Sequence, residues 1–250
     1  MRKLPVKEKV HFVHESIRNN PSKTKVCVIG AGGSGSFLIN KLAMMNQALM
    51  SLGKPGLMVY VYDADTVEIP NLHRTSFMDG DVGKNKAVVA VERLNRVYGT
   101  AWIGIPEMFR LDQKDNESTL MITCVDSIKS RKECYNLFNL GYAHYWIDLG
   151  NGTDYAQTIL GTLQPIKQPI SKKYECVEEL KHFNKMFGWP EDNPNVPSCS
   201  FAEAISKQSL WINQRVALSA AELIWDMFTS DYLTCHAEFI NKDECKKLRI

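Results

Sequence analysis

The sequence of 250 residues lacks features that mark several other classes of protein. It contains no apolar run that approaches the length of a membrane-spanning helix, about 18 residues. Its start lacks the apolar core of a secretory signal. Its 30 basic and 28 acidic residues leave a net charge of only +2, which gives no reason to expect general binding to nucleic acid or membranes. We therefore expect a cytoplasmic protein that is neither exported nor membrane-embedded.

Paired cysteines are also missing. The chain has seven cysteines, an odd number, and no two of them stand in C-x-x-C spacing. They are Cys27, Cys124, Cys134, Cys176, Cys199, Cys235 and Cys245. This pattern argues against a disulfide framework and against a structural zinc site, and it indicates reduced thiols.

Glycines, by contrast, are concentrated in one turn. The apolar run Val26–Ile29 leads into Gly30, Gly32, Gly33 and Gly35, and residues 36–50 have the apolar period of a helix. Glycine permits a sharp turn and lets backbone N–H groups approach a phosphate, and the helix N-terminus adds its positive dipole end. The segment predicts a nucleotide site. The alternative is a tight strand–helix turn with no ligand.

Strands and helices alternate up to residue 150. We expect strands at 57–62, 101–109, 120–125, 145–149 and 158–163, and helices at 84–97 and 130–140. This order predicts an α/β fold, with a doubly wound, mainly parallel Rossmann-like sheet and helices on both faces.

The remaining segments are expected to complete one domain over residues 1–250. We expect residues 1–25 to form a helical or irregular lead-in before the first strand. The proline-rich segment 164–199, with a helical patch at 177–187, predicts a crossover or lid over the ligand edge of the sheet. Residues 201–228 have a sustained helical period and should pack along the sheet.

An aspartate follows each of two of these strands. Asp63 ends the strand 57–62, where a nucleotide-binding fold places an acidic group for ribose hydroxyls. The alternative is an aspartate that caps a turn. Asp126 follows the strand 120–125, and a carboxylate there could be a single ligand of Mg²⁺, or it could cap the helix near Ser130.

The loop after Asp63 distinguishes between kinds of nucleotide. Asn71, Arg74 and Lys86 lie close to the glycine turn in the predicted fold, and two cations with an amide suit a triphosphate better than the pyrophosphate of a nicotinamide cofactor. Each cation could instead be an ordinary surface residue. Without this loop, the glycine turn and Asp63 would suggest an NAD(P)-dependent oxidoreductase.

Four segments together resemble the ThiF/MoeB adenylyltransferases and the adenylation domains of ubiquitin-activating enzymes. They are GAGGSG at 30–35, DADTVEIPNLHR at 63–74, GKNK at 83–86 and TCVDS at 123–127. By this resemblance Asp63 would bind the ribose of ATP, Asn71, Arg74 and Lys86 its phosphates, and Asp126 Mg²⁺. The resemblance also implies a homodimer.

The segment that starts at PSCS (197–200) and continues into the helix 201–228 looks most like the ThiF-family member of bacterial PRTRC plasmid cassettes. That likeness implies a small ubiquitin-like β-grasp protein as partner. The sequence departs from the family in three ways. It lacks the N-terminal R-Y-x-R-Q segment, for which Arg2 and Arg18 are the nearest candidates; it lacks the paired C-x-x-C motifs; and His73 and Ser127 replace a usual glutamine and asparagine.

The implied reaction is attack by the partner's C-terminal carboxylate on the α-phosphorus of ATP, which yields an acyl-adenylate. Cys199 is the candidate nucleophile for a following thioester step, because a helix N-terminus would lower the pKa of its thiol. Ser198 and Ser200 equally suit an ordinary helix cap around a buried cysteine. A non-catalytic scaffold that holds a ubiquitin-like protein is the alternative function.

Overall fold

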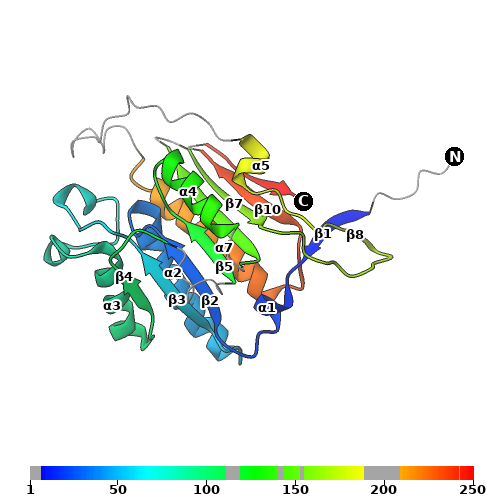
Figure 1. Ribbon diagram of the computed structural model, residues 1–250, viewed down its shortest axis with the longest axis horizontal. Coiled ribbons are helices and arrows are strands. Elements are labelled where there is room, and N and C mark those ends of the chain that lie inside the picture. The colour runs from blue at the N-terminus through cyan, green and yellow to red at the C-terminus, as the bar shows by residue number, and fades with distance from the viewer. Residues whose placement is uncertain (1–6, 111–118, 140–142, 153–154, 189–208, 242) are drawn as a thin grey trace.

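The computed structural model describes residues 7–110, 119–139, 143–152, 155–188, 209–241 and 243–250. Within these ranges, eight strands form one mixed sheet in the order β11-β10-β7-β6-β5-β2-β3-β4, and three short strands form a second sheet. Helices cover both faces of the large sheet (Figure 1). The predicted α/β fold with a mainly parallel, Rossmann-like sheet is confirmed.

Five strands make up the parallel half of the large sheet. They are β2 (Thr24–Ile29), β3 (Leu57–Tyr62), β4 (Ile103–Ile105), β5 (Leu120–Thr123) and β6 (Tyr145–Asn151). Their order places β2 beside β5, although the two are far apart in the sequence. The winding direction therefore reverses between β2 and β5, and open α/β sheets form a ligand crevice outside the strand ends at such a point.

Strand β2 shows why the sequence forms buried strands here. Val26 and Val28 pack into the core on one face of the sheet, whereas Cys27 and Ile29 pack into the core on the other face. Side chains of a strand alternate between faces, so a strand covered on both sides is apolar throughout. The apolar run before the glycine turn follows from this double burial.

Three antiparallel strands extend the sheet beyond β6. They are β7 (Ala156–Thr162), β10 (Cys235–Ile240) and β11 (Cys245–Arg249). The sequence analysis predicts β7 but not β10 and β11.

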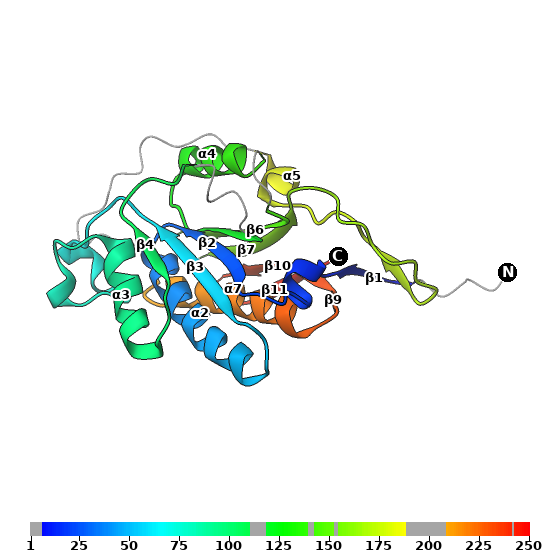
Figure 2. The ribbon, with the colours of Figure 1, turned by 60° about the horizontal axis from the view of Figure 1, so that its bottom comes forward.

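The helices form a layer on each side of the sheet (Figure 2). Helices α1 (Glu15–Arg18), α2 (Gly33–Ser51) and α7 (Ile212–Thr229) lie on one face, and α2 and α7 pack against each other. Helices α4 (Ile128–Phe138) and α5 (Phe183–Phe187) lie on the other face. Helix α3 (Lys86–Tyr98) packs against β4 and α2.

The second sheet corrects the expectation for the first 25 residues. Strand β1 (Glu8–Phe12) lies between β8 (Tyr174–Cys176) and β9 (Tyr232–Leu233), and all three are outside the large sheet. The expectation of a helical or irregular lead-in over residues 1–25 is wrong for β1. Its strand partners lie more than 150 residues away, so no local pattern points to them.

Two predicted segments differ in extent from the structure. Of the proline-rich segment, residues 164–188 contain β8 and α5, so the helical patch predicted at 177–187 is shortened to 183–187. Residues 189–199 lie outside the described residues, and so do residues 201–208 of the predicted long helix, of which α7 is the described part. No helix in the described ranges has both the length and the apolar character needed to cross a bilayer.

Candidate functional site

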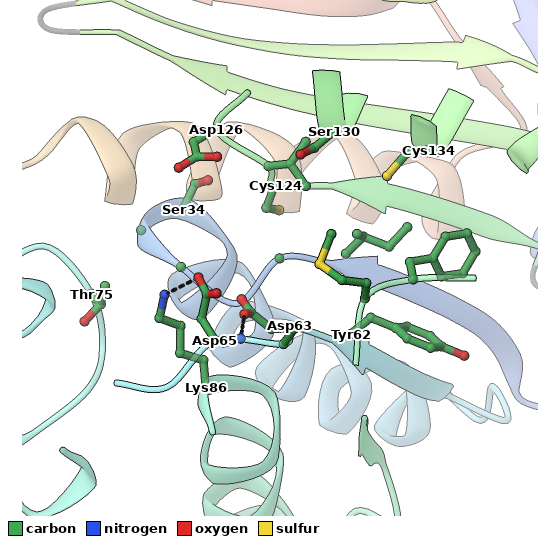
Figure 3. A pocket seen from close by; sticks show the side chains of 18 of the residues that line it. Ser34, Tyr62, Asp63, Asp65, Thr75, Lys86, Cys124, Asp126, Ser130 and Cys134 are labelled. Carbon is green, nitrogen blue, oxygen red and sulfur yellow. Dashed lines mark hydrogen bonds and ion pairs between the residues drawn. The ribbon is translucent and has the colours of Figure 1, made fainter. Parts of the chain in front are cut away.

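A pocket of about 440 Å³ lies at the ends of β2, β3 and β5, where the winding reverses. Figure 3 shows side chains that come from the loops after these three strands, from the starts of α2 and α3, and from α4. Eight residues predicted from the sequence line it: Gly30, Gly32, Gly33, Asp63, Asn71, Arg74, Lys86 and Asp126. Segments distributed over nearly 100 residues of sequence therefore meet at one place.

The glycine turn is held tightly against β5. Gly30 has a φ of +94°, and a Cβ there would lie 2.7 Å from the carbonyl oxygen of Cys124. Gly35 is not among the residues that line the pocket; a Cβ there would lie 2.0 Å from the carbonyl oxygen of Gly30. The absence of a side chain at Gly35 therefore lets the start of α2 pack closely against the glycine turn.

The N-terminus of α2 opens into the pocket. The helix starts at Gly33, its N-cap is Gly32, and no side chain of the described residues caps it. Gly32, Gly33 and Ser34 line the pocket, and the first turn of the helix carries no acidic residue. Unpaired N–H groups and the positive end of the helix dipole make this end suitable for an anion.

Asp63 connects the end of β3 to the glycine turn. Its Oδ2 accepts a hydrogen bond from the N–H of Ala31 at 2.7 Å, and its Oδ1 accepts one from the N–H of Asp65 at 2.9 Å. Burial raises the pKa of Asp63 above its ordinary value, and the two backbone N–H groups oppose that rise. The carboxylate thus shapes the pocket wall as well as lining it.

Lys86 is positioned by the residue before it. Asn85 caps α3 by accepting from the N–H of Val88, and its Nδ2 donates to the carbonyl oxygens of Asp63 and Asp65 at 2.8 and 3.0 Å. The Nζ of Lys86, whose side chain is only 12% exposed, forms an ion pair with Asp65 at 2.9 Å. Figure 3 shows this pair at the side of the pocket opposite Cys134. Neither Asn85 nor Asp65 was predicted from the sequence.

Arg74 lies on a loop that is held by hydrogen bonds to α2 and α3. Next to it, the N–H of Ser76 donates to Oγ of Ser36 on α2, and Arg93 on α3 donates to the carbonyl oxygen of Ser76. The side chain of Arg74 is exposed and makes no hydrogen bond or ion pair to a described residue. Its guanidinium is therefore available to a ligand of the pocket.

Asn71 is only partly available to a ligand. It ends the short 3-10 helix Ile69–Asn71, and its Oδ1 accepts from the N–H of Glu68 at 3.0 Å. The amide oxygen thus stabilises the loop, whereas Nδ2 has no recorded partner among the described residues. As a phosphate ligand, Asn71 would act through this donor group.

Asp126 does not cap α4. Ser127 is the N-cap and accepts from the N–H of Ser130 at 3.0 Å, so the capping interpretation of Asp126 is wrong. The carboxylate of Asp126 is exposed and makes no hydrogen bond to any residue in the described ranges. Figure 3 shows it near Ser34, in the first turn of α2.

A buried ion pair supports the strand end that precedes Asp126. Nε of Arg131 lies 2.7 Å from Oδ1 of Asp148, and their side chains are 6% and 1% exposed. Arg131 also donates from Nη2 to the carbonyl oxygens of Val125 and Leu149, each at 3.2 Å. The sequence analysis missed this pair. An arginine five residues after Asp126 was the available signal, but its partner Asp148 lies within a separate strand, β6.

Apolar side chains line the far end of the pocket. Tyr62 lies there (Figure 3), and its ring meets that of Phe109 edge to face with centroids 5.1 Å apart; Ile29 and Val125 are further apolar lining residues. Such surfaces suit a flat aromatic group. Cys134 also lines the pocket, but burial raises the pKa of its thiol to about 12, so it stays protonated at neutral pH.

Asn213, in the first turn of α7, is a further lining residue that the sequence analysis missed. Cys199 and Arg2 lie outside the described residues. Arg18, the last residue of α1, does not line the pocket. Its Nη1 forms an ion pair with Asp231 at 3.1 Å. Residues 164–188 of the predicted lid do not line the pocket either.

The model of the ThiF family matches residues 7–246, nearly the whole chain. The chain belongs to the ThiF family. Its similarity to a NEDD8-activating enzyme E1 catalytic subunit of Arabidopsis thaliana is 34% identity over 114 residues, which are 43% of this chain and 23% of that protein. A ubiquitin-like modifier-activating enzyme 5 of Dictyostelium discoideum is 27% identical over 183 residues, 67% of this chain and 44% of that protein.

A solved structure agrees with the fold. The crystal structure of E. coli MccB superposes with a TM-score of 0.57 over 94% of this chain and 63% of that chain, at 18% sequence identity. At this identity the likeness concerns the fold alone. The chain also spans less than half the length of the two curated relatives.

Proposed function

We propose that this ThiF-family chain is an ATP-dependent adenylyltransferase that activates the C-terminal carboxylate of a small ubiquitin-like β-grasp protein. The observation that supports this most directly is the joint placement of Arg74, Lys86 and Asp126 around the uncapped start of α2. Two cations and a helix N-terminus form a site for several phosphates, and the unpaired carboxylate adds a metal ligand.

The base, the ribose and the phosphates of ATP would each find a suitable surface along the length of the pocket. The apolar end with Tyr62 and Phe109 suits the base, Asp63 lies between it and the glycine turn, and Arg74 and Lys86 lie at the polar end. A Cβ on Gly32 would meet no heavy atom within 4 Å, so the turn leaves open space for a phosphate. A dinucleotide cofactor would leave the two cations without an evident role.

Asp126 is the residue that would hold Mg²⁺. Its carboxylate is exposed and unpaired among the described residues, which fits an ion that keeps most of its ligands as water and phosphate oxygens. A bound Mg²⁺ would neutralise part of the phosphate charge. Arg74, Lys86 and the N–H groups at the start of α2 would orient the polyphosphate and stabilise the charge that develops on it.

The proposed chemistry is a substitution at the α-phosphorus. A carboxylate oxygen of the partner forms the new P–O bond, the bond to the bridging oxygen of the β-phosphate breaks, and pyrophosphate leaves with the electron pair. The attacking carboxylate is already ionised at neutral pH, so no general base is needed. Arg74 and Lys86 would reduce the repulsion between the two anions.

Several finer statements belong to this proposal. We propose that the chain acts as a cytoplasmic homodimer, that it forms a single adenylation domain, and that its partner is the β-grasp protein of a PRTRC-type cassette. A thioester on Cys199 would be a second step. A reducible conjugate with the partner that disappears in Cys199→Ser is the expected result for that step.

Isotope exchange between pyrophosphate and ATP tests the proposed function. Exchange should require a β-grasp protein with a free C-terminal carboxylate, and it should be lost in Asp126→Ala and in Arg74→Ala. Both side chains are exposed, so both variants should keep the thermal stability of the parent. ATP binding without any exchange would instead indicate the scaffold function. A shift in melting temperature with NAD but not with ATP would contradict both.

A further inference from the structure

Asn213 is buried at the junction of the elements that form the pocket. Its side chain extends from the first turn of α7 and the residue is only 3% exposed. Its Nδ2 donates to the carbonyl oxygen of Arg74 at 3.0 Å, and its Oδ1 accepts from Nδ2 of Asn151, the last residue of β6, at 2.7 Å. One amide thus uses both of its polar ends within the protein.

The same side chain also packs against the start of α2. A Cβ on Gly33 would lie 2.7 Å from Nδ2 of Asn213 and 2.9 Å from its Oδ1. Gly33, Arg74, Asn151 and Asn213 all line the pocket. Asn213 therefore joins α2, the Arg74 loop, β6 and α7 at the polar end of the site.

The hydrogen bond to Arg74 has a specific consequence. The guanidinium of Arg74 has no partner among the described residues, so contacts of the backbone must determine where this side chain starts. The bond from Asn213 is made directly to the peptide carbonyl of Arg74. A phosphate contact depends on that placement, because a charge-assisted hydrogen bond weakens steeply with distance and angle.

We propose that Asn213 is a positioning residue: it fixes the backbone of Arg74 and thereby sets how tightly the pocket binds the phosphates of its nucleotide. This inference rests on the proposed function, since it assumes that Arg74 contacts phosphate. The role needs an amide, which supplies a donor for Arg74 and an acceptor for Asn151 from one planar group. An aspartate of the same shape supplies no donor.

The two ligands ATP and adenosine separate this role from a purely structural one. In Asn213→Ala, the dissociation constant for ATP should rise about tenfold, which corresponds to ~1.4 kcal/mol. Adenosine has no phosphate, so its binding should stay within about twofold of the parent. Pyrophosphate exchange should show a higher KM for ATP with a smaller change in kcat.

Asn213→Asp provides a second variant that keeps the volume of the side chain. A carboxylate oxygen would then face the carbonyl oxygen of Arg74, and its negative charge would lie at the phosphate end of the pocket. ATP binding should therefore weaken more than in Asn213→Ala, again with adenosine binding retained. Unchanged ATP binding in this variant overturns the positioning role even if the alanine variant fails to fold.

Asn46 offers a matched control elsewhere in the protein. It is also a buried asparagine, 4% exposed, and its Oδ1 accepts from the N–H of Leu57 at 2.7 Å, but it does not line the pocket. Asn46→Ala should lower the melting temperature by about as much as Asn213→Ala does. It should leave the affinity for ATP unchanged.

The results distinguish the inference from the proposed function. Unchanged ATP binding in both Asn213 variants, or an equal loss of ATP and adenosine binding, overturns the positioning role and leaves the proposed function standing. A parent protein that binds no ATP overturns the proposed function, and the inference with it. Equal loss of ATP affinity in Asn46→Ala would show that general destabilisation is the cause, which also overturns the inference.

Discussion

The N–H of Ala31 donates to Oδ2 of Asp63 at 2.7 Å, so the carboxylate at the end of β3 holds the glycine turn that follows β2. From the sequence, a ribose ligand and a turn cap are alternative interpretations of Asp63. The structure shows that the carboxylate of Asp63 accepts hydrogen bonds from the backbone N–H groups of Ala31 and Asp65. Asp63 also lines the pocket. A change at this position should therefore affect stability and ligand binding together.

We expect Asp63→Ala to lower the free energy of unfolding by about 1–3 kcal/mol, because the N–H groups of Ala31 and Asp65 lose their acceptor. Affinity for ATP should fall in the same variant. Asp63→Asn retains one acceptor oxygen and should lie between the parent and the alanine variant. Urea unfolding and a titration with ATP measure the two effects. An unfolding free energy equal to that of the parent would contradict the role of the two hydrogen bonds.

Two glycines of the turn should respond in opposite ways to alanine. Gly35→Ala places a Cβ 2.0 Å from the carbonyl oxygen of Gly30, so the helix start must move and the melting temperature should fall by several degrees. Gly32→Ala meets no atom within 4 Å and should keep most of the stability while weakening ATP binding. Thermal unfolding with and without ATP compares the pair. Similar stability losses in both would contradict the packing argument.

In the proposed function, Asp65 would compete with phosphate for Lys86. The ion pair joins an aspartate side chain that is 72% exposed to a nearly buried lysine, and exposed pairs contribute little to stability. Asp65→Asn should therefore leave the melting temperature nearly unchanged and tighten ATP binding by about two- to fivefold. In a Lys86→Ala background the same change should have no effect on affinity, which a double-mutant cycle measures. Weaker ATP binding in Asp65→Asn would show that Asp65 itself serves the ligand.

The buried pair of Arg131 and Asp148 should be costly to break. Arg131→Leu leaves the carboxylate of Asp148 buried without its counter-charge, and the free energy of unfolding should fall by about 3–5 kcal/mol. Arg96→Leu, at an exposed position of α3, is the control and should change it by less than about 0.5 kcal/mol. Chemical denaturation of both variants measures the difference. An equal change in the free energy of unfolding in both variants would show that the Arg131–Asp148 pair does not stabilise the segment after β5.

Five buried or partly buried histidines predict a loss of stability in mild acid. Burial lowers the pKa of each, and the pKa of His182 falls to about 4. A lowered folded-state pKa means that the unfolded chain binds more protons, so stability is complete above about pH 6.5 and declines as the pH falls from there toward 4. The melting temperature should follow this course.

His182 offers a variant that isolates one contribution. Its ring lies between Tyr135 and Trp146, with centroids 4.9 and 5.4 Å away, so phenylalanine should fit the same space. His182→Phe should reduce the slope of melting temperature against pH between 6.5 and 4 without a loss of stability at pH 7.5. An unchanged slope would show that His182 does not titrate on unfolding in this range.

The sequence was sufficient to predict the parts of the site that follow from local patterns. Glycine spacing, a strand end and a polar loop place Gly30, Asp63 and Arg74, and the doubly wound order brings them together. Asp126 was predicted on the same basis, and its alternative as a cap was resolved only by the hydroxyl of Ser127, which is a comparably good cap. A propensity alone cannot choose between two adjacent capping residues.

The parts that were missed depend on contacts between distant segments. Asn213 lies in a helix whose sequence predicts only an amphipathic pattern, and its partners Arg74 and Asn151 are 139 and 62 residues away. Strands β1 and β10 likewise pair with strands that no short-range pattern identifies. Burial and hydrogen bonding of this kind arise from the tertiary structure, so one sequence does not reveal them.

The two borders of the large sheet differ in how they discourage further pairing. Strand β4 at one border has only three residues, and β11 at the other exposes Lys246, Lys247 and Arg249. Short edges and exposed cations both oppose the addition of another strand. Self-association by continuation of the large sheet is therefore disfavoured, and a second copy of the protein is expected to make contact through other surfaces.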